Sequence, residues 1–171
     1  MVLEIRAPRY KDEIEQAVNV AVDLKHTEQE GRWFDEEAIP SIKRSLETEH
    51  SLVAVYNGVV IGFATFKKKG LFPWTKDWEL SWIGVLRRFH RTDLRAGEKL
   101  IEGVVSEIKK AGGEFLFVET VSPVAKYENE QGKQSVENYK KTRMFYRKQG
   151  FKWHSEKRYR NNEIAMYILK I

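Results

Sequence analysis

The sequence contains no cysteine, and none of its apolar runs approaches the roughly 20 residues that a membrane-spanning helix needs. The absence of cysteine excludes disulfide bonds, thiolate nucleophiles and thiolate metal sites. The four histidines are scattered without metal-ligand spacing, so we expect no metal: His26, His50, His90 and His154. The N-terminal residues Met1 to Glu4 do not resemble a signal peptide. We therefore expect a cytoplasmic protein with no membrane partner.

The composition is that of a globular protein. The chain has 171 residues, of which 42% are apolar and 32% are charged, and no internal repeat is visible. This length fits one domain that is large enough to bury most of its apolar side chains in a core. We expect a single domain that spans residues 1–171.

The central part of the chain has the pattern of a strand, a helix and a second strand. Trp78–Val85 has strand chemistry, and its Gly84 indicates either a bulge or a close approach of another group. A helical spacing of apolar residues follows from Gly97 to Lys110, and the apolar run Phe115–Val121 comes next. This order predicts two parallel strands joined by a right-handed helical crossover.

Other strands and helices surround this unit. Asp35 and Ser135 are candidate caps for two of the helices, and the polar stretch Ser122–Gln134 is expected to be a long loop. The remaining expected elements are a strand at Leu3–Arg6, helices at Tyr10–Lys25 and Asp35–Leu46, a hairpin of Ser51–Tyr56 and Val59–Phe66 around Asn57-Gly58, a helix at Ser135–Lys148, and strands at Phe151–Tyr159 and Glu163–Leu169 around Asn161-Asn162. The order predicts a mixed α/β sheet.

Basic residues gather between the central strand and the helix that follows it. They are Arg87, Arg88, His90, Arg91 and Arg95. The start of a helix attracts anions because its first N–H groups are unpaired and its dipole is positive there. A phosphate site and an ordinary solvated connection both fit this segment.

Two local motifs carry a resemblance to a known family. Arg91–Ala96 is similar to an Arg/Gln-x-x-Gly-x-Gly/Ala loop, although Leu94 stands at the inner glycine; in the alternative register, Thr92–Gly97, Arg95 stands there. Thr142–Phe151 resembles an A-x-x-x-Y-x-x-x-G-F signature that includes Tyr146, Gly150 and Phe151. With these motifs, the order of elements resembles the GNAT superfamily of acetyl-CoA-dependent N-acetyltransferases.

The resemblance implies a fold, an activity and a set of site residues. The fold would be a mixed, mostly antiparallel sheet of about seven strands with a central parallel βαβ unit and flanking helices. The protein would be an enzyme that transfers an acetyl group directly from acetyl-CoA to a primary amine. Tyr146 would protonate the departing thiolate; it could also be an ordinary packed aromatic. The implied acetyl-CoA contacts are Ile83, Gly84 and Val85 of the strand, Arg91, Thr92, Asp93, Leu94, Arg95, Ala96 and Gly97 of the loop, and Tyr139 and Thr142 of the later helix.

Acetyl transfer also needs a base, because the attacking amine must be neutral while a lysine-type amine has a pKa of about 10.4. Glu79 is the candidate, on the central strand and on the face expected for Ser81 and Ile83. A solvent-facing carboxylate is the alternative. A bulge at Gly84 would present an N–H group to the developing oxyanion. Trp82 is expected to lie in the core rather than in a substrate pocket.

A rival interpretation comes from the charge of the C-terminal part. Residues 139–160 contain nine Lys or Arg and one acidic residue, Glu156. This surface could serve a non-catalytic module that senses acyl-CoA or binds nucleic acid, but no base-reading motif is present, so we do not expect nucleic acid. A protein N-terminus, a lysine, a polyamine and another small amine all remain open as acceptors. The C-terminal strands could also pair in a homodimer.

Overall fold

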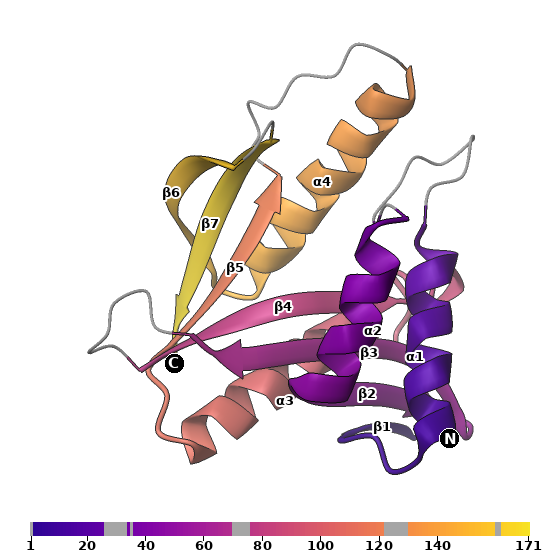
Figure 1. Ribbon diagram of the computed structural model, residues 1–171. Helices are drawn as coiled ribbons and strands as arrows, with labels where there is room; N and C mark the ends of the chain where they lie inside the picture. The colour runs from indigo at the N-terminus through magenta and orange to yellow at the C-terminus, as the bar shows by residue number, and fades with distance from the viewer. Residues whose placement is uncertain (1, 26–33, 35, 70–75, 122–129, 160–161) are drawn as a thin grey trace.

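The computed structural model describes residues 2–25, 34, 36–69, 76–121, 130–159 and 162–171, which form one seven-stranded sheet with helices on both faces (Figure 1). The strands lie in the order β1-β2-β3-β4-β5-β7-β6. The elements are β1 (Leu3–Arg6), α1 (Lys11–Asp23), α2 (Ala38–Thr48), β2 (His50–Tyr56), β3 (Val59–Lys68), β4 (Asp77–Val85), the 3₁₀ turn η1 (Arg87–Phe89), α3 (Ala96–Lys110), β5 (Phe115–Val121), α4 (Glu130–Lys148), β6 (Lys152–Tyr159) and β7 (Asn162–Lys170).

The sheet is mixed, as the sequence predicts. Every neighbouring pair is antiparallel except β4 and β5, which are parallel and joined through α3. The turn Asn57-Gly58 joins β2 to β3, with φ angles of 53° and 77°. Both are positive, as a two-residue hairpin of this type requires. The predicted βαβ unit and the predicted hairpin are therefore confirmed.

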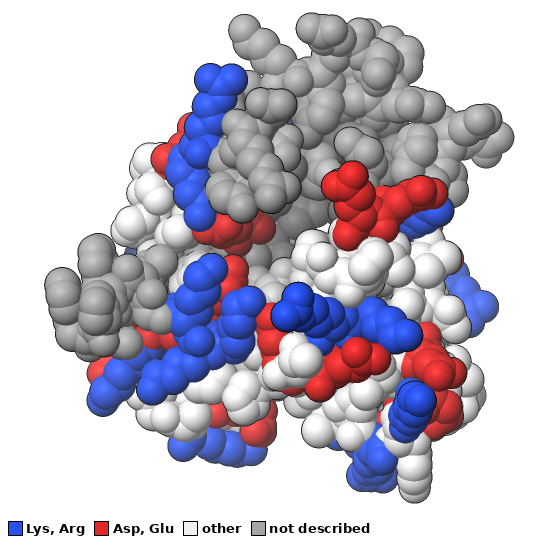
Figure 2. Space-filling view, viewed as in Figure 1, with Lys and Arg blue, Asp and Glu red and all other residues white. Residues whose placement is uncertain are grey.

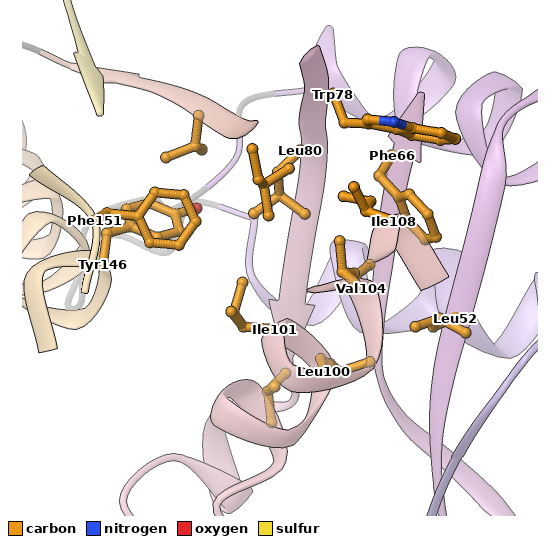
Figure 3. Packing of buried hydrophobic residues seen from close by; sticks show 14 of the residues in the cluster. Leu52, Phe66, Trp78, Leu80, Leu100, Ile101, Val104, Ile108, Tyr146 and Phe151 are labelled. Carbon is orange, nitrogen blue, oxygen red and sulfur yellow. The ribbon is translucent and has the colours of Figure 1, made fainter. Parts of the chain in front are cut away.

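Two cores hold the helices to opposite faces of the sheet. On one face, α1 and α2 pack over β2–β4 around Val20, Ile42 and Phe63. On the other face, α3 places its apolar side against the strands, and α4 adds Tyr146. Figure 3 shows Leu100, Ile101, Val104 and Ile108 of α3 directed toward the sheet. The sheet thus has an α1–α2 face and an α3–α4 face.

The parallel strands β4 and β5 stay paired over only a short length. Their ladder covers Asp77↔Phe115, Trp78↔Leu116 and Glu79↔Phe117. β4 continues to Val85 and β5 to Val121, but the two strands diverge beyond that ladder (Figure 1). β5 pairs instead with β7 along its whole length. The sheet is therefore split between β4 and β5.

A bulge in β4 lies at Ser81 and not at Gly84, where a bulge was one of the two alternatives that the sequence left open. The pairing with β3 passes from Phe66↔Leu80 to Thr65↔Trp82, which leaves Ser81 as the extra residue. A bulge reverses the alternation of side chains along a strand. The expectation that Glu79 and Ile83 share a face is consequently wrong: Ile83 packs on the α3–α4 face, whereas Trp82 packs on the α1–α2 face.

Gly84 instead allows neighbouring side chains to approach β4 closely, which is the other alternative that the sequence left open. A Cβ atom at this position would lie 2.9 Å from Leu24 Cδ1 and 2.9 Å from Phe63 Cε1. Such distances are shorter than van der Waals contact, so α1 can pack tightly on β4 only because residue 84 has no side chain.

The last long helix begins earlier than predicted. α4 starts at Glu130, so Ser135 lies inside the helix and does not cap it, and the expected loop Ser122–Gln134 ends sooner. Glutamate, glutamine and lysine between residues 130 and 134 favour a helix more than the polar composition suggested. His26, the candidate cap Asp35, residues 122–129 of the expected loop and Asn161 of the expected turn lie outside the described residues. None of the described helices is long and apolar enough to cross a membrane.

A buried ion pair ties the first strand to the first helix. Arg6 Nη2 lies 2.7 Å from Glu13 Oε1, and the backbone N–H of Arg9 donates to Glu13 Oε2 at 2.6 Å. The side chain of Glu13 is only 9% exposed. Hydrogen bonds from Arg6 lower the pKa of Glu13 from 4.5 to about 2, although burial opposes them.

This pair predicts an acid-sensitive part of the stability. Because the folded state lowers the pKa of Glu13, its contribution is complete above pH 4.5 and is lost as the pH falls toward about 2. We expect about 3 kcal/mol of the free energy of unfolding to disappear over this range. Urea unfolding at several pH values measures it. The Glu13→Gln variant should be less stable at neutral pH and should lose less stability on acidification; an identical loss in both proteins would contradict the assignment.

Candidate active site

A cleft of about 990 Å³ opens where β4 and β5 separate. It reaches from α2 on one side to α3 and α4 on the other. Its lining is Leu24, Phe34, Glu37, Ala38, Ser41, Ser81, Trp82, Ile83, Gly84, Val85, Phe89, His90, Arg91, Gly97, Val118, Glu119, Thr120, Tyr139, Lys141, Thr142, Phe145 and Tyr146.

The cleft is lined from both faces of the sheet, and its part on each face is named the α1–α2 mouth or the α3–α4 mouth. Trp82 belongs to the α1–α2 face, and Ile83 and Val118 belong to the α3–α4 face. Because successive side chains of a strand point to opposite faces, Glu119 follows Val118 onto the α1–α2 face. The α2 residues of the lining open on the α1–α2 face, and the α4 residues on the other. The split in the sheet therefore connects the two faces.

The edge of β4 presents backbone groups to the cleft. The N–H of Leu86 donates to the carbonyl of Ile61 at 2.8 Å, which makes residues 61 and 86 a hydrogen-bonded pair. By alternation, Gly84 also bonds to β3, whereas Ile83 and Val85 point their backbone groups the other way, into the split. A ligand with amide groups can pair with this edge as an added strand would. The N–H groups that face the cleft are those of Ile83 and Val85, not that of Gly84.

His90 occupies one position on this edge. Its Nε2 lies 2.7 Å from the carbonyl oxygen of Val85. Burial lowers the pKa of His90, and the cations of Arg87 and Arg91 act in the same direction. A neutral ring that donates its Nε2–H to a carbonyl satisfies both observations. His90 thus fixes the end of β4 and forms part of the cleft wall.

The loop before α3 adopts backbone angles that are typical of a glycine-rich loop, although arginines stand at these positions. Arg91 and Arg95 have φ angles of 57° and 49°, in the left-handed region that glycine usually supplies. Arg95 immediately precedes α3, which favours the register Thr92–Gly97 of the motif. Arg91 and Gly97 line the cleft, whereas Arg95 is exposed and forms an ion pair with Glu98. Thr92, Asp93, Leu94, Arg95 and Ala96 are absent from the lining.

Tyr146 is buried at the cleft wall. It is 4% exposed and packs between Phe145 and Phe151, with ring centroids 5.5 Å and 5.4 Å away. In Figure 3 its ring lies beside that of Phe151. Burial raises the pKa of the Tyr146 phenol, so the hydroxyl stays protonated at any working pH. A group of this kind can donate a proton to a more basic atom, but it is a poor base.

Glu79 does not line the described cleft. It lies before the Ser81 bulge, where β4 is still paired with β5, and its Oε2 is 3.2 Å from Lys69 Nζ and 3.6 Å from Lys67 Nζ. Lys67 also donates to Glu49 at 2.9 Å, and this bond raises the pKa of Lys67. Glu79 therefore belongs to a charged cluster under α2. Its role as the base stays a prediction from the sequence alone.

The structure gathers most, though not all, of the residues singled out in the sequence. Those along the cleft are Ile83, Gly84, Val85, Arg91, Gly97, Tyr139, Thr142 and Tyr146. Trp82 also lines it and is only partly buried, so its assignment to the core is wrong in part. Sequence reasoning missed Glu119 and Glu37. Glu119 could have been noticed as the one acidic residue in the apolar run Phe115–Val121, whereas nothing marks Glu37 among its acidic neighbours.

Comparisons with known proteins agree on one family. The acetyltransferase (GNAT) family model matches residues 14–132. No curated protein sequence matches the chain. Among solved structures, a protein from Desulfovibrio desulfuricans assigned to the GNAT family superimposes with a TM-score of 0.76 at 19% identity, covering 99% of each chain.

Two further structures share this fold. An aminoglycoside 6'-N-acetyltransferase complexed with coenzyme A has a TM-score of 0.70 at 14% identity, covering 99% of this chain and 97% of that one. The ribosomal-protein-S18-alanine N-acetyltransferase from Escherichia coli has a TM-score of 0.67 at 17% identity, covering 99% and 94%. At these identities the likeness concerns the fold.

Proposed function

This chain belongs to the acetyltransferase (GNAT) family, and we propose that it transfers an acetyl group from acetyl-CoA to a primary amine. The observation that carries the proposal is the split between β4 and β5, with Tyr146 in its wall and the backbone of Ile83 along its edge. When bound, acetyl-CoA supplies an acetyl group that is activated as a thioester.

The residues of the α3–α4 mouth suit acetyl-CoA. The backbone groups of Ile83 and the N–H of Val85 can pair with the amides of its pantetheine arm. The first N–H groups of α3 at Gly97, together with Arg91 and Lys141, supply positive charge and donors for phosphates. The lining of the cleft thus combines a strand edge for amides with cations for anionic groups.

Two side chains of the cleft can move the protons of the reaction. Glu119 is our candidate base: it lines the cleft, its side chain is 25% exposed, and it forms an ion pair with Lys157 of β6. It would accept the proton that the amine loses as the new C–N bond forms. Tyr146 would give its hydroxyl proton to the sulfur as the C–S bond breaks, and would recover a proton from solvent. The Ile83 or Val85 N–H can stabilise the negative charge that develops on the carbonyl oxygen.

Calorimetric titration with acetyl-CoA tests the first requirement of this proposal. We expect micromolar binding that weakens when the comparator lacks the 3′-phosphate, because the phosphates contact charged groups. Release of free thiol in the presence of amines then reports turnover. An unaltered affinity for acetyl-CoA in an Arg91→Ala variant would remove Arg91 from the phosphate site.

The outcome also separates the two functions that the sequence allowed. Binding of acetyl-CoA without turnover of any amine would favour a module that senses acyl-CoA. No binding at low salt would contradict the proposal and would direct attention to the exposed cations of α4 and β6, which include Lys140, Lys148, Lys152 and Arg158.

A further inference from the structure

The two mouths of the cleft differ in charge, and we propose from this difference that the acceptor is a small amine that carries a second positive charge. The inference rests on the proposed acetyl transfer and names the class of its acceptor. Glu37 is the specificity-determining residue in this account: it would hold the cationic group that does not react.

Two carboxylate side chains line the α1–α2 mouth. Glu119 of β5, which is paired with Lys157, lines this mouth, and so does Glu37, the residue that precedes α2. In the space-filling view from this side, acidic side chains gather at the upper end of α2 (Figure 2). Glu36 is already paired with Lys25, whereas no described cation is paired with Glu37. Glu37 therefore has its charge available to a ligand at this mouth.

Aromatic rings and a hydroxyl complete this mouth. Phe34 and Trp82 both line the cleft and meet edge to face, with centroids 5.8 Å apart. The face of an indole ring attracts ammonium groups, so an aromatic wall beside carboxylates suits a cation more than an anion. The Oγ atom of Ser81 is buried and has no hydrogen bond of good geometry. It lies close enough to Glu49 to help lower the pKa of that carboxyl.

The opposite mouth has the reverse charge. Among the described residues that line it, the ionised side chains are Arg91, from the loop before α3, and Lys141, from α4. An acidic acceptor would therefore meet carboxylates on the α1–α2 side, even though the whole chain has a net charge of +5. Opposite charges at the two mouths would guide an anionic donor and a cationic acceptor to different faces of the sheet.

An acceptor with a single positive charge could not interact with both carboxylates during the reaction. The amine that attacks must lose its proton, and Glu119 serves that step. A second ammonium group keeps its charge throughout the reaction and can stay paired with Glu37. Since Glu37 is exposed, we expect this contact to improve kcat/KM by about fivefold, the upper range of an exposed ion pair.

Three acceptors of equal chain length test the inference: 1,4-diaminobutane, butylamine and 4-aminobutanoate, with thiol release from acetyl-CoA as the readout. We expect kcat/KM to be highest for the diamine and lowest for the amino acid. In the Glu37→Gln variant the advantage of the diamine over butylamine should vanish. Glu36→Gln is the matched control: the neighbouring carboxylate is absent from the cleft lining, so the variant should keep the advantage.

The results also distinguish the failure of this inference from the failure of the proposed function. Equal kcat/KM for all three acceptors, or a diamine advantage that survives in Glu37→Gln, would overturn the cationic acceptor alone. An absence of turnover with every amine, in protein that binds acetyl-CoA, would overturn acetyl transfer and this inference with it. High salt should reduce the advantage of the diamine, because screening weakens exposed ion pairs.

Discussion

Replacement of Glu119 by glutamine is expected to lower kcat at neutral pH by about 100-fold, the lower end of what a positioned base contributes. Glutamine has nearly the same shape as glutamate but cannot accept a proton. The amine would then react only in the small fraction that is already neutral, because its own pKa is about 10.4. The deficit should therefore shrink as the pH rises toward that value. Steady-state rates at saturating acetyl-CoA between neutral and alkaline pH measure this convergence.

Glu79→Gln is the matched control for this experiment. The residue lies on the neighbouring strand, outside the described cleft lining and paired with Lys67 and Lys69. We expect the variant to keep most of its turnover, and both variants to keep their affinity for acetyl-CoA. If Glu79→Gln loses activity and Glu119→Gln retains it, the base is Glu79, as the sequence predicts. A Glu119→Gln deficit that is constant with pH would show that Glu119 does not act as a base.

Tyr146→Phe is expected to reduce kcat by about 100-fold, with little change in the KM for the amine. The phenol is buried and its pKa is raised by that burial, so the native side chain always carries the proton that it is proposed to give to sulfur. Phenylalanine keeps the ring contacts with Phe145 and Phe151, and a thermal melt should show a folded protein.

Tyr139→Phe serves as the comparison for this variant. Tyr139 lies on the same helix and also lines the cleft, so the substitution removes a second hydroxyl from the same wall. We expect a change in the KM for acetyl-CoA rather than in kcat. Full activity of Tyr146→Phe would mean that water or another group supplies the proton, and equal losses in both variants would point to a general disturbance of the wall.

The architecture could be predicted from the sequence because its signals are local. The helical spacing of Leu100, Ile101, Val104 and Ile108 identifies α3, and Asn57-Gly58 identifies the hairpin. Tyr146 was found because a short motif with fixed spacing contains it. In each case the residues that carry the signal lie close to one another in the sequence.

The cleft depends on contacts that are distant in the sequence. Nothing near Glu79 shows that the β4–β5 ladder ends there, because that separation follows from the pairing of β5 with β7. Ser81, the extra residue, then reverses the face to which each later side chain of β4 points. Ile83 therefore does not lie on the predicted side. The pairing of Glu79 with two lysines on or beside β3 likewise arises only in the folded chain.

The split that runs through the sheet also bears on the order in which substrates bind. Two ligands that enter a closed pocket by one opening must bind in sequence, because the outer one blocks the inner one. Here the donor and the acceptor of the proposed reaction would arrive from opposite faces, and neither would have to pass the other. For the proposed reaction we therefore expect no compulsory order: acetyl-CoA and the amine would each bind to the free protein and form the same ternary complex.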